Sequence, residues 1–150
     1  MGYIYDNVTG RIAAVVHQGT PTPPAGFSLS NDVIQDADLL SKKRDIGTGL
    51  LVNRDRLAIS GTPGVPAGTV GQIVVQKYDG TTGAPKTDPS DTDAVSYALE
   101  STLAFMNKAS GTLAAGADAV KIAAPVTQED ARFLVFSPEL QLLDTMVSFD

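Results

Sequence analysis

Glycine and proline interrupt this chain so often that long helices have little room to form. The sequence has 14 Gly and 9 Pro among 150 residues, and the apolar segments between these breaks are short. Short apolar segments separated by turn residues are typical of antiparallel β-structure. Because 43% of the residues are hydrophobic, the chain also has enough apolar material for a core. We therefore predict an all-β protein.

Several segments have the alternation or apolar content of strands. Residues 3–16 place a turn signal, Asn7 to Gly10, between two apolar stretches, which predicts a β-hairpin. Further strands are expected at residues 50–52, 57–59, 72–78, 118–124, 132–137 and 143–149. Their spacing after residue 57 is typical of an antiparallel sandwich. We expect Val74 and Phe136 to lie in its core.

Two segments fit more than one template. Residues 93–111 fit two strands broken near residues 100–102, which the β-rich flanks favour, but apolar residues four positions apart also fit a helix. Residues 31–44 fit either a short helix that begins at Asn31 or Asp32, or an irregular linker. The three prolines within residues 19–26 favour an extended, polyproline-like path.

The character of the sequence changes near Gly61, in a bend rich in glycine and proline. The hairpin and the proline-rich segment precede this bend, and the regularly spaced strands follow it. We therefore predict two modules, a hairpin-and-arm attachment module over residues 1–56 and a β-sandwich over residues 57–150. Because Pro63 and Pro66 interrupt the glycines, the bend does not match a phosphate-binding loop.

The overall charge and composition exclude several classes of partner and chemistry. The formal net charge of −6 disfavours binding to nucleic acid and to anionic lipid. The chain has no Cys, so disulfides and Cys-ligated metals are excluded. No apolar run is long enough to span a membrane as a helix, and the N-terminus lacks the pattern of a signal peptide.

We find no constellation of residues that would support catalysis. His17 is the single histidine, and no nucleophile motif lies near it. Asp88, Asp91 and Asp93 form an acidic loop, but the central Gly and distal Glu of a calcium loop are missing. We expect this loop to be solvated, and we predict a protein that is not an enzyme and that holds no cofactor and no metal.

Basic residues are concentrated in one part of the chain. Lys42, Lys43 and Arg44 are consecutive, and Arg54 and Arg56 follow. One interpretation is a solvated cluster that favours a helix C-terminus. The other is a contact patch for an acidic partner surface.

Loose motifs along the chain resemble those of phage structural proteins. The opening YDNVTGRIAAVV, followed by PPAGFSL and LLVNRDRL, resembles the N-terminal portions of small tailed-bacteriophage virion proteins. The remainder is similar to immunoglobulin-like domains displayed on phage heads and tails. That similarity consists of a strand of the type I-x-V-Q-K, a D-G-x-T-G turn, a later G-x-L-x-x-G-x-x-x-V-x-I unit and a closing strand. The Cys and Trp of the immunoglobulin core are absent.

This resemblance implies a capsid decoration or cement protein with an immunoglobulin-like β-sandwich, assembled onto the virion in the bacterial cytoplasm. Its hairpin and arm would attach it to the major capsid protein or to tail proteins, as a homo-oligomer or in a symmetric array. The contact residues expected on this basis are Tyr3, Tyr5, Arg11, Pro23, Pro24, Phe27, Lys42, Lys43 and Arg44. Two alternatives stay open: a tail, fibre or baseplate component, and a carbohydrate-binding module, which the absence of Trp disfavours.

Overall fold

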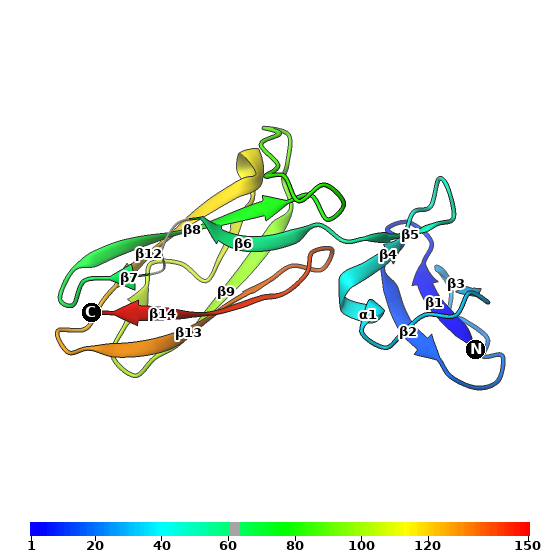
Figure 1. The fold of residues 1–150 in the computed structure, drawn as a ribbon, viewed down its shortest axis with the longest axis horizontal. Helices are drawn as coiled ribbons and strands as arrows, with labels where there is room; N and C mark the ends of the chain where they lie inside the picture. Colours follow the sequence, from blue (N-terminus) through cyan, green and yellow to red (C-terminus); the bar gives the residue numbers. More distant parts are fainter. Residues whose placement is uncertain (61–63) are drawn as a thin grey trace. The chain divides into compact units, whose positions relative to one another are not determined.

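The computed structural model describes residues 1–60 and 64–150. The chain divides into two compact units, Met1–Arg54 and Asp55–Asp150 (Figure 1). We refer to them as the N-terminal unit and the sandwich unit. Arg56 pairs with Tyr78 inside the sandwich unit, so the units divide two residues before the position expected from the sequence.

The predicted hairpin forms the centre of the N-terminal unit. Strands β1 (Gly2–Asp6) and β2 (Ile12–Val16) pair antiparallel. The Asp6 carboxylate closes the turn, since its Oδ1 accepts the N–H groups of Val8 and Thr9 at 2.8 and 2.9 Å. A third strand that the sequence did not predict, β3 (Phe27–Ser30), pairs with the other side of β1, so the sheet order is β2-β1-β3.

The rest of the N-terminal unit corrects the expectation for residues 31–44. The helix α1 (Asp38–Ser41) is a single turn, and the basic run after it is a strand, β4 (Lys42–Arg44), paired with β5 (Leu51–Asn53). The backbone N–H of Arg44 donates to the carbonyl oxygen of Gly10 at 2.8 Å, which fixes β4 beside the hairpin turn. A Cβ at Gly10 would lie 1.8 Å from the carbonyl oxygen of Arg44, so this close approach requires glycine.

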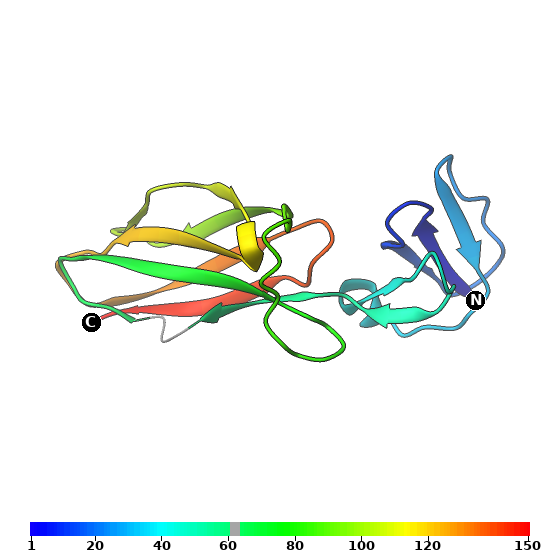
Figure 2. The ribbon, with the colours of Figure 1, turned by 90° about the horizontal axis from the view of Figure 1, so that it is seen from above.

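The sandwich unit consists of two sheets. The strand order is β10-β12-β8-β6 in one sheet and β11-β9-β13-β14-β7 in the other. Figure 1 and Figure 2 show the long strands of this unit running along a common direction. Their bounds are β6 (Arg56–Ser60), β7 (Gly64–Val65), β8 (Val70–Tyr78), β9 (Ala94–Glu100), β10 (Phe105–Met106), β11 (Ser110–Thr112), β12 (Ala117–Ala123), β13 (Glu129–Phe136) and β14 (Leu143–Phe149), with a short 3-10 turn, η1 (Ala114–Gly116), before β12.

The core of the sandwich unit lies between its two sheets. Sixteen buried hydrophobic residues of the described chain form one cluster there, and Val75 and Phe133 are completely buried within it. The sequence placed Val74 and Phe136 in this core, and the structure shows that this is wrong. Both side chains face outward from their strands, and Phe136 is 45% exposed. A contiguous apolar run such as Ile73 to Val75 does not show which face is buried.

Residues 93–111 form strands, as the β-rich flanks favoured, and the helical alternative is wrong. After β9 the chain breaks at residues 101–104, where the Oγ of Ser101 accepts the N–H groups of Leu103 and Ala104 at 3.1 and 2.9 Å. The short strand β10 then pairs with β12 in the opposite sheet, and β11 returns to pair with β9. This segment therefore contributes to both layers of the sandwich.

The glycine- and proline-rich bend is described only in part. Residues 61–63, including Gly61 and Pro63, lie outside the described residues. The following Gly64 and Val65 form β7, which pairs parallel with β14, and Gly71 belongs to β8. No helix in the described part of the chain is long and apolar enough to cross a membrane.

Candidate functional site

Arg44 organises the interior of the N-terminal unit instead of lying free on its surface. Its Nη1 donates to the hydroxyl oxygen of Tyr3 at 3.1 Å and to the Oγ of Ser30 at 3.3 Å. Its guanidinium lies over the ring of Tyr5, 4.9 Å from the centroid. The hydrogen bond to Tyr3 raises the pKa of Arg44 above its ordinary value. Tyr3 is completely buried, so the expectation that its side chain contacts a partner is corrected: Tyr3 is a core residue.

The other expected contact residues lie in different settings. Arg11 and Lys43 are brought side by side by an antiparallel bridge, and both are half-buried. Lys42 forms an ion pair with Asp38, in which Nζ and Oδ1 are 3.8 Å apart. Pro23 and Phe27 are half-buried and Pro24 is exposed, on or next to the connection that leads into β3. These residues do not form one continuous basic patch, because Arg44 is engaged within the unit and Arg54 is buried.

The N-terminal unit leaves more large apolar side chains exposed than it buries. Within residues 1–54, all of which the structure describes, the buried hydrophobic residues are Tyr3 and Ile12. The large apolar side chains left exposed there are those of Met1, Val8, Val33, Leu40, Ile46 and Leu50, and Val33, Leu40 and Leu50 are each 65% exposed. The sequence analysis missed these residues. A usable signal existed for Val33 and Leu40, which are large apolar residues in a segment without strand alternation.

The two units also differ in charge. Residues 1–54 contain five Asp and five Lys or Arg, so the N-terminal unit has no formal net charge. Residues 55–150 contain twelve Asp or Glu and six Lys or Arg, so the sandwich unit carries the entire net charge of −6. A neutral surface approaches an anionic partner without the long-range repulsion that the sandwich unit would meet.

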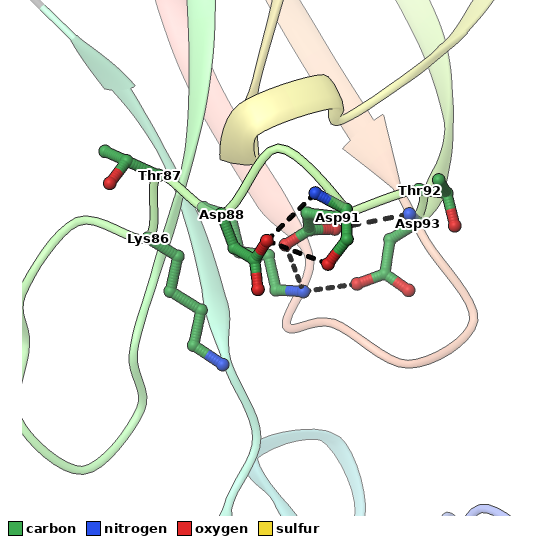
Figure 3. A pocket seen from close by; sticks show the side chains of 8 residues that line it. Lys86, Thr87, Asp88, Asp91, Thr92 and Asp93 are labelled. Atoms are coloured by element: carbon green, nitrogen blue, oxygen red, sulfur yellow. Dashed lines mark hydrogen bonds and ion pairs between the residues drawn. The ribbon is translucent and has the colours of Figure 1, made fainter.

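A cluster of charged side chains joins β8 to the loop between β8 and β9 in the sandwich unit (Figure 3). Lys77 is at an inward-facing position of β8 and is 7% exposed. Its Nζ bonds Asp91 at 2.8 Å, bonds Asp93, and lies 3.9 Å from the Oδ2 of Asp55. Burial alone would lower the pKa of Lys77, but the hydrogen bonds from its amine to Asp91 and Asp93 outweigh that effect and raise the pKa.

These contacts correct the expectation of a solvated acidic loop. Figure 3 shows the side chains of Asp91 and Asp93 converging on one amine, that of Lys77, whereas Lys86 extends away from them. The Nζ of Lys86 bonds the carboxylate of Asp55 at 2.5 Å. Asp88 is exposed, and its carboxylate is bonded within the loop to Ser90. Because the cluster combines carboxylates with two lysines, it is arranged to hold the loop against β8. Among the described residues, no group of acidic or His side chains is arranged to hold a metal ion.

A second, partly buried polar group links the two sheets of the sandwich unit. The hydroxyl of Tyr97 donates to the carboxylate of Asp118, and the Nζ of Lys108 bonds the same carboxylate at 2.8 Å. Burial raises the pKa of Tyr97, and the hydrogen bond to Asp118 raises it further. Burial on its own would raise the pKa of Asp118, but the hydrogen bonds from Lys108 and Tyr97 outweigh it and lower that pKa below 3.8. The Nε2 of the single histidine, His17, lies 3.0 Å from the Oδ1 of Asp36, and both side chains are exposed.

Comparison with solved structures shows the fold of the chain. A glycosyl hydrolase family 2 member from Bacteroides cellulosilyticus aligns with a TM-score of 0.53 and 12% identity, over 66% of this chain and 14% of its own. A β-glycosidase from Bacteroides vulgatus gives a TM-score of 0.52 and 13% identity, over 98% of this chain and 21% of its own. The Yersinia pseudotuberculosis adhesin InvE aligns with a TM-score of 0.50 and 13% identity, over 67% of this chain and 34% of its own.

These similarities concern architecture. The sandwich unit has an immunoglobulin-like β-sandwich fold. This confirms the antiparallel sandwich that the strand spacing predicted and the immunoglobulin-like type that the resemblance implied. The chain spans only a small part of the length of these proteins, and identities this low carry no information about activity or ligand. No protein-family model matches the sequence, and no curated protein matches it.

Proposed function

We propose that this chain is a non-enzymatic virion structural protein whose N-terminal unit attaches to the phage capsid as a decoration or cement protein. The immunoglobulin-like sandwich unit is the part displayed. The observation that supports this proposal is the surface of the N-terminal unit, which exposes Val33, Leu40 and Leu50 while burying only Tyr3 and Ile12 among its hydrophobic residues.

A unit of 54 residues has little apolar surface to bury on its own. Domains below about 70–80 residues usually need disulfides, a metal or association for stability. The chain has no Cys, and no metal-holding group is present in the residues that the structure describes. Association is therefore the remaining source of stability for this unit. A large assembly that covers the exposed apolar side chains would supply it.

The distribution of charge favours the same assignment of roles to the two units. The neutral N-terminal unit is suited to contact, whereas the acidic sandwich unit is suited to stay in solvent and to keep neighbouring copies apart. Many identical weak contacts on a symmetric particle would add through avidity. The tail, fibre or baseplate alternative uses the same unit on a different surface.

The test is co-sedimentation with empty capsids and, separately, with tails of the phage whose genome encodes this sequence. We expect the full chain to sediment with capsids. The double variant Leu40→Asp/Leu50→Asp should lose binding, because it places carboxylates on the contact surface. Val126→Asp is the matched control, since Val126 is 86% exposed on the sandwich unit and its replacement should leave binding unchanged.

The outcomes distinguish attachment to capsids from attachment to tails, and attachment through the N-terminal unit from attachment through the sandwich unit. Binding to tails alone would replace the capsid proposal by the tail alternative. Binding to neither particle would overturn the virion proposal. Capsid binding that is lost in Val126→Asp but kept in Leu40→Asp/Leu50→Asp would assign attachment to the sandwich unit and overturn the role given to the N-terminal unit.

A further inference from the structure

The sheet of the N-terminal unit ends on one side in β3, and the described part of the chain leaves the outer edge of this strand open. In the order β2-β1-β3, the residue before β2, Arg11, is bridged to Lys43 of β4. Strand β3 pairs with β1 alone, and its outer edge has no strand partner within the described residues. An open edge offers backbone N–H and C=O groups to another strand.

The register of β1 and β3 shows which groups are offered. The N–H of Asn7 donates to the carbonyl oxygen of Gly26 at 3.0 Å, directly before β3 begins. Because hydrogen-bonded pairs alternate along an antiparallel ladder, Ser28 and Ser30 direct their backbone groups toward β1. Phe27, Leu29 and Asn31 direct theirs outward.

All three outward positions leave backbone groups available for pairing. The N–H of Phe27 is used within the chain, since it donates to the carbonyl oxygen of Pro24 at 3.1 Å. The groups that remain are the C=O of Phe27, both backbone groups of Leu29 and the N–H of Asn31. This set of groups is self-complementary. If a second copy of the chain is placed by a twofold rotation about an axis beside Leu29, each N–H of one β3 strand faces a C=O of the other.

We propose that two copies of this chain pair antiparallel through β3 and join their N-terminal sheets into one six-stranded sheet. In this arrangement the N–H of Leu29 donates to the C=O of the partner's Leu29, and the N–H of Asn31 donates to the C=O of the partner's Phe27. The twofold axis repeats both bonds, which gives four in all. This pairing is a property of the chain alone and stands whether or not the larger assembly is a virion.

Features of sequence and charge favour a second copy as the occupant of this edge. Residues 27–31, FSLSN, contain no charged side chain and no Pro, which are the residues that usually block pairing at an edge. The N-terminal unit has no net charge, so two such units meet without net repulsion. Among the marginal strands of the sandwich sheets, β7, β10 and β11 are only two or three residues long. The fourth, β6, is five residues long, but it begins with the charged Arg56, which is bridged to Gln141.

The first test is analytical ultracentrifugation of the full chain over a concentration series. We expect a closed dimer with twice the 15.6 kDa mass of the chain. Leu29→Pro removes an outward N–H that has no role within the unit, so it should halve the mass at every concentration while the circular dichroism spectrum stays unchanged. A wild-type chain that is monomeric throughout, or that forms an open-ended series of larger species, would overturn the proposal.

A cross-link keeps the test decisive should Leu29→Pro disturb folding. The chain has no Cys, so Leu29→Cys introduces a single thiol. Hydrogen-bonded antiparallel pairs have Cα atoms about 5.5 Å apart, within the range for a disulfide. Mild oxidation should convert Leu29→Cys to a disulfide-linked dimer at least about ten times faster than the exposed control Thr22→Cys. Equal rates for the two variants would contradict pairing at β3.

Discussion

The two units of this protein differ in the size of their hydrophobic cores and in their net charge. The sandwich unit buries sixteen hydrophobic residues of the described chain between two sheets and carries the whole net charge of −6. The N-terminal unit buries Tyr3 and Ile12, relies on the contacts of Arg44, and has no net charge. The sandwich unit therefore has a core of its own, whereas we propose that the N-terminal unit is completed by contact with other molecules.

The largest effect is expected in the core of the sandwich unit. Val75→Asp places a carboxylate between the sheets without a partner, which we expect to cost about 4 kcal/mol or more and to unfold the unit. Val74→Asp is the matched control on the same strand, because Val74 faces outward and its variant should stay folded. Urea denaturation followed by circular dichroism measures both. Equal loss in the two variants would show that the assignment of the inner face is wrong.

The charged cluster around Lys77 should give the next largest effect. Asp91→Asn leaves Lys77 buried with a weaker set of partners, so we expect a loss of about 3 kcal/mol in the free energy of unfolding. In a Lys77→Met background the same change should cost much less, because the buried charge is gone. A double-mutant cycle measured by urea denaturation tests this coupling. An equal loss of unfolding free energy in both backgrounds would contradict the coupling and support the solvated loop that the sequence predicted.

Acid should weaken the sandwich unit through Asp118. The pKa of Asp118 is lowered in the folded state, so its contribution is present above 3.8 and is lost as the pH falls through the folded value. We expect Asp118→Asn to cost about 2 kcal/mol at neutral pH and to lose less stability than the parent between pH 4 and the acid limit. Thermal melting at a series of pH values measures this. Parallel curves for the parent and the variant would contradict the role of Asp118.

The smallest effect concerns the N-terminal unit. Arg44→Ala removes hydrogen bonds to Tyr3 and Ser30 and the contact with the Tyr5 ring, at an expected cost of about 1–2 kcal/mol to that unit. Lys43→Ala, on the same strand, is the control and should change little. Limited proteolysis reads out the N-terminal unit separately, since Arg44→Ala should speed cleavage within residues 1–54 and leave the sandwich unit resistant. Faster cleavage in both units would show that they are coupled.

Local patterns predicted the fold wherever the strands were long or their alternation was clear. The strand β14 shows this well, because the buried Val147 and Phe149 alternate with Met146, which is exposed, and Ser148, which is half-buried. Strand β3 was missed because its four residues follow a proline-rich segment and depend on pairing with β1. The sequence of residues 31–44 fits either a short helix that ends in the basic run or an irregular linker, but pairing with β5 and the close approach of Gly10 make residues 42–44 a strand.

The sites depended on contacts that no local pattern contains. Lys77 continues the inward alternation of Ile73 and Val75, which was a usable signal for a buried charge. Its partner Asp93 lies sixteen positions away, and only the folded loop brings the two together. Tyr3 and Arg44 were both expected at a partner surface, yet they meet across 41 positions to form the interior of the N-terminal unit.

Hydrogen–deuterium exchange of the chain, free at low concentration and bound to capsids, tests the contrast between the units most directly. We predict that amides of β1 and β2 exchange about 100-fold faster than those of β8 and β13 in the free chain, and that capsid binding slows only the former. Equally slow exchange in both units of the free chain would contradict the claim that the N-terminal unit is completed by contact with other molecules.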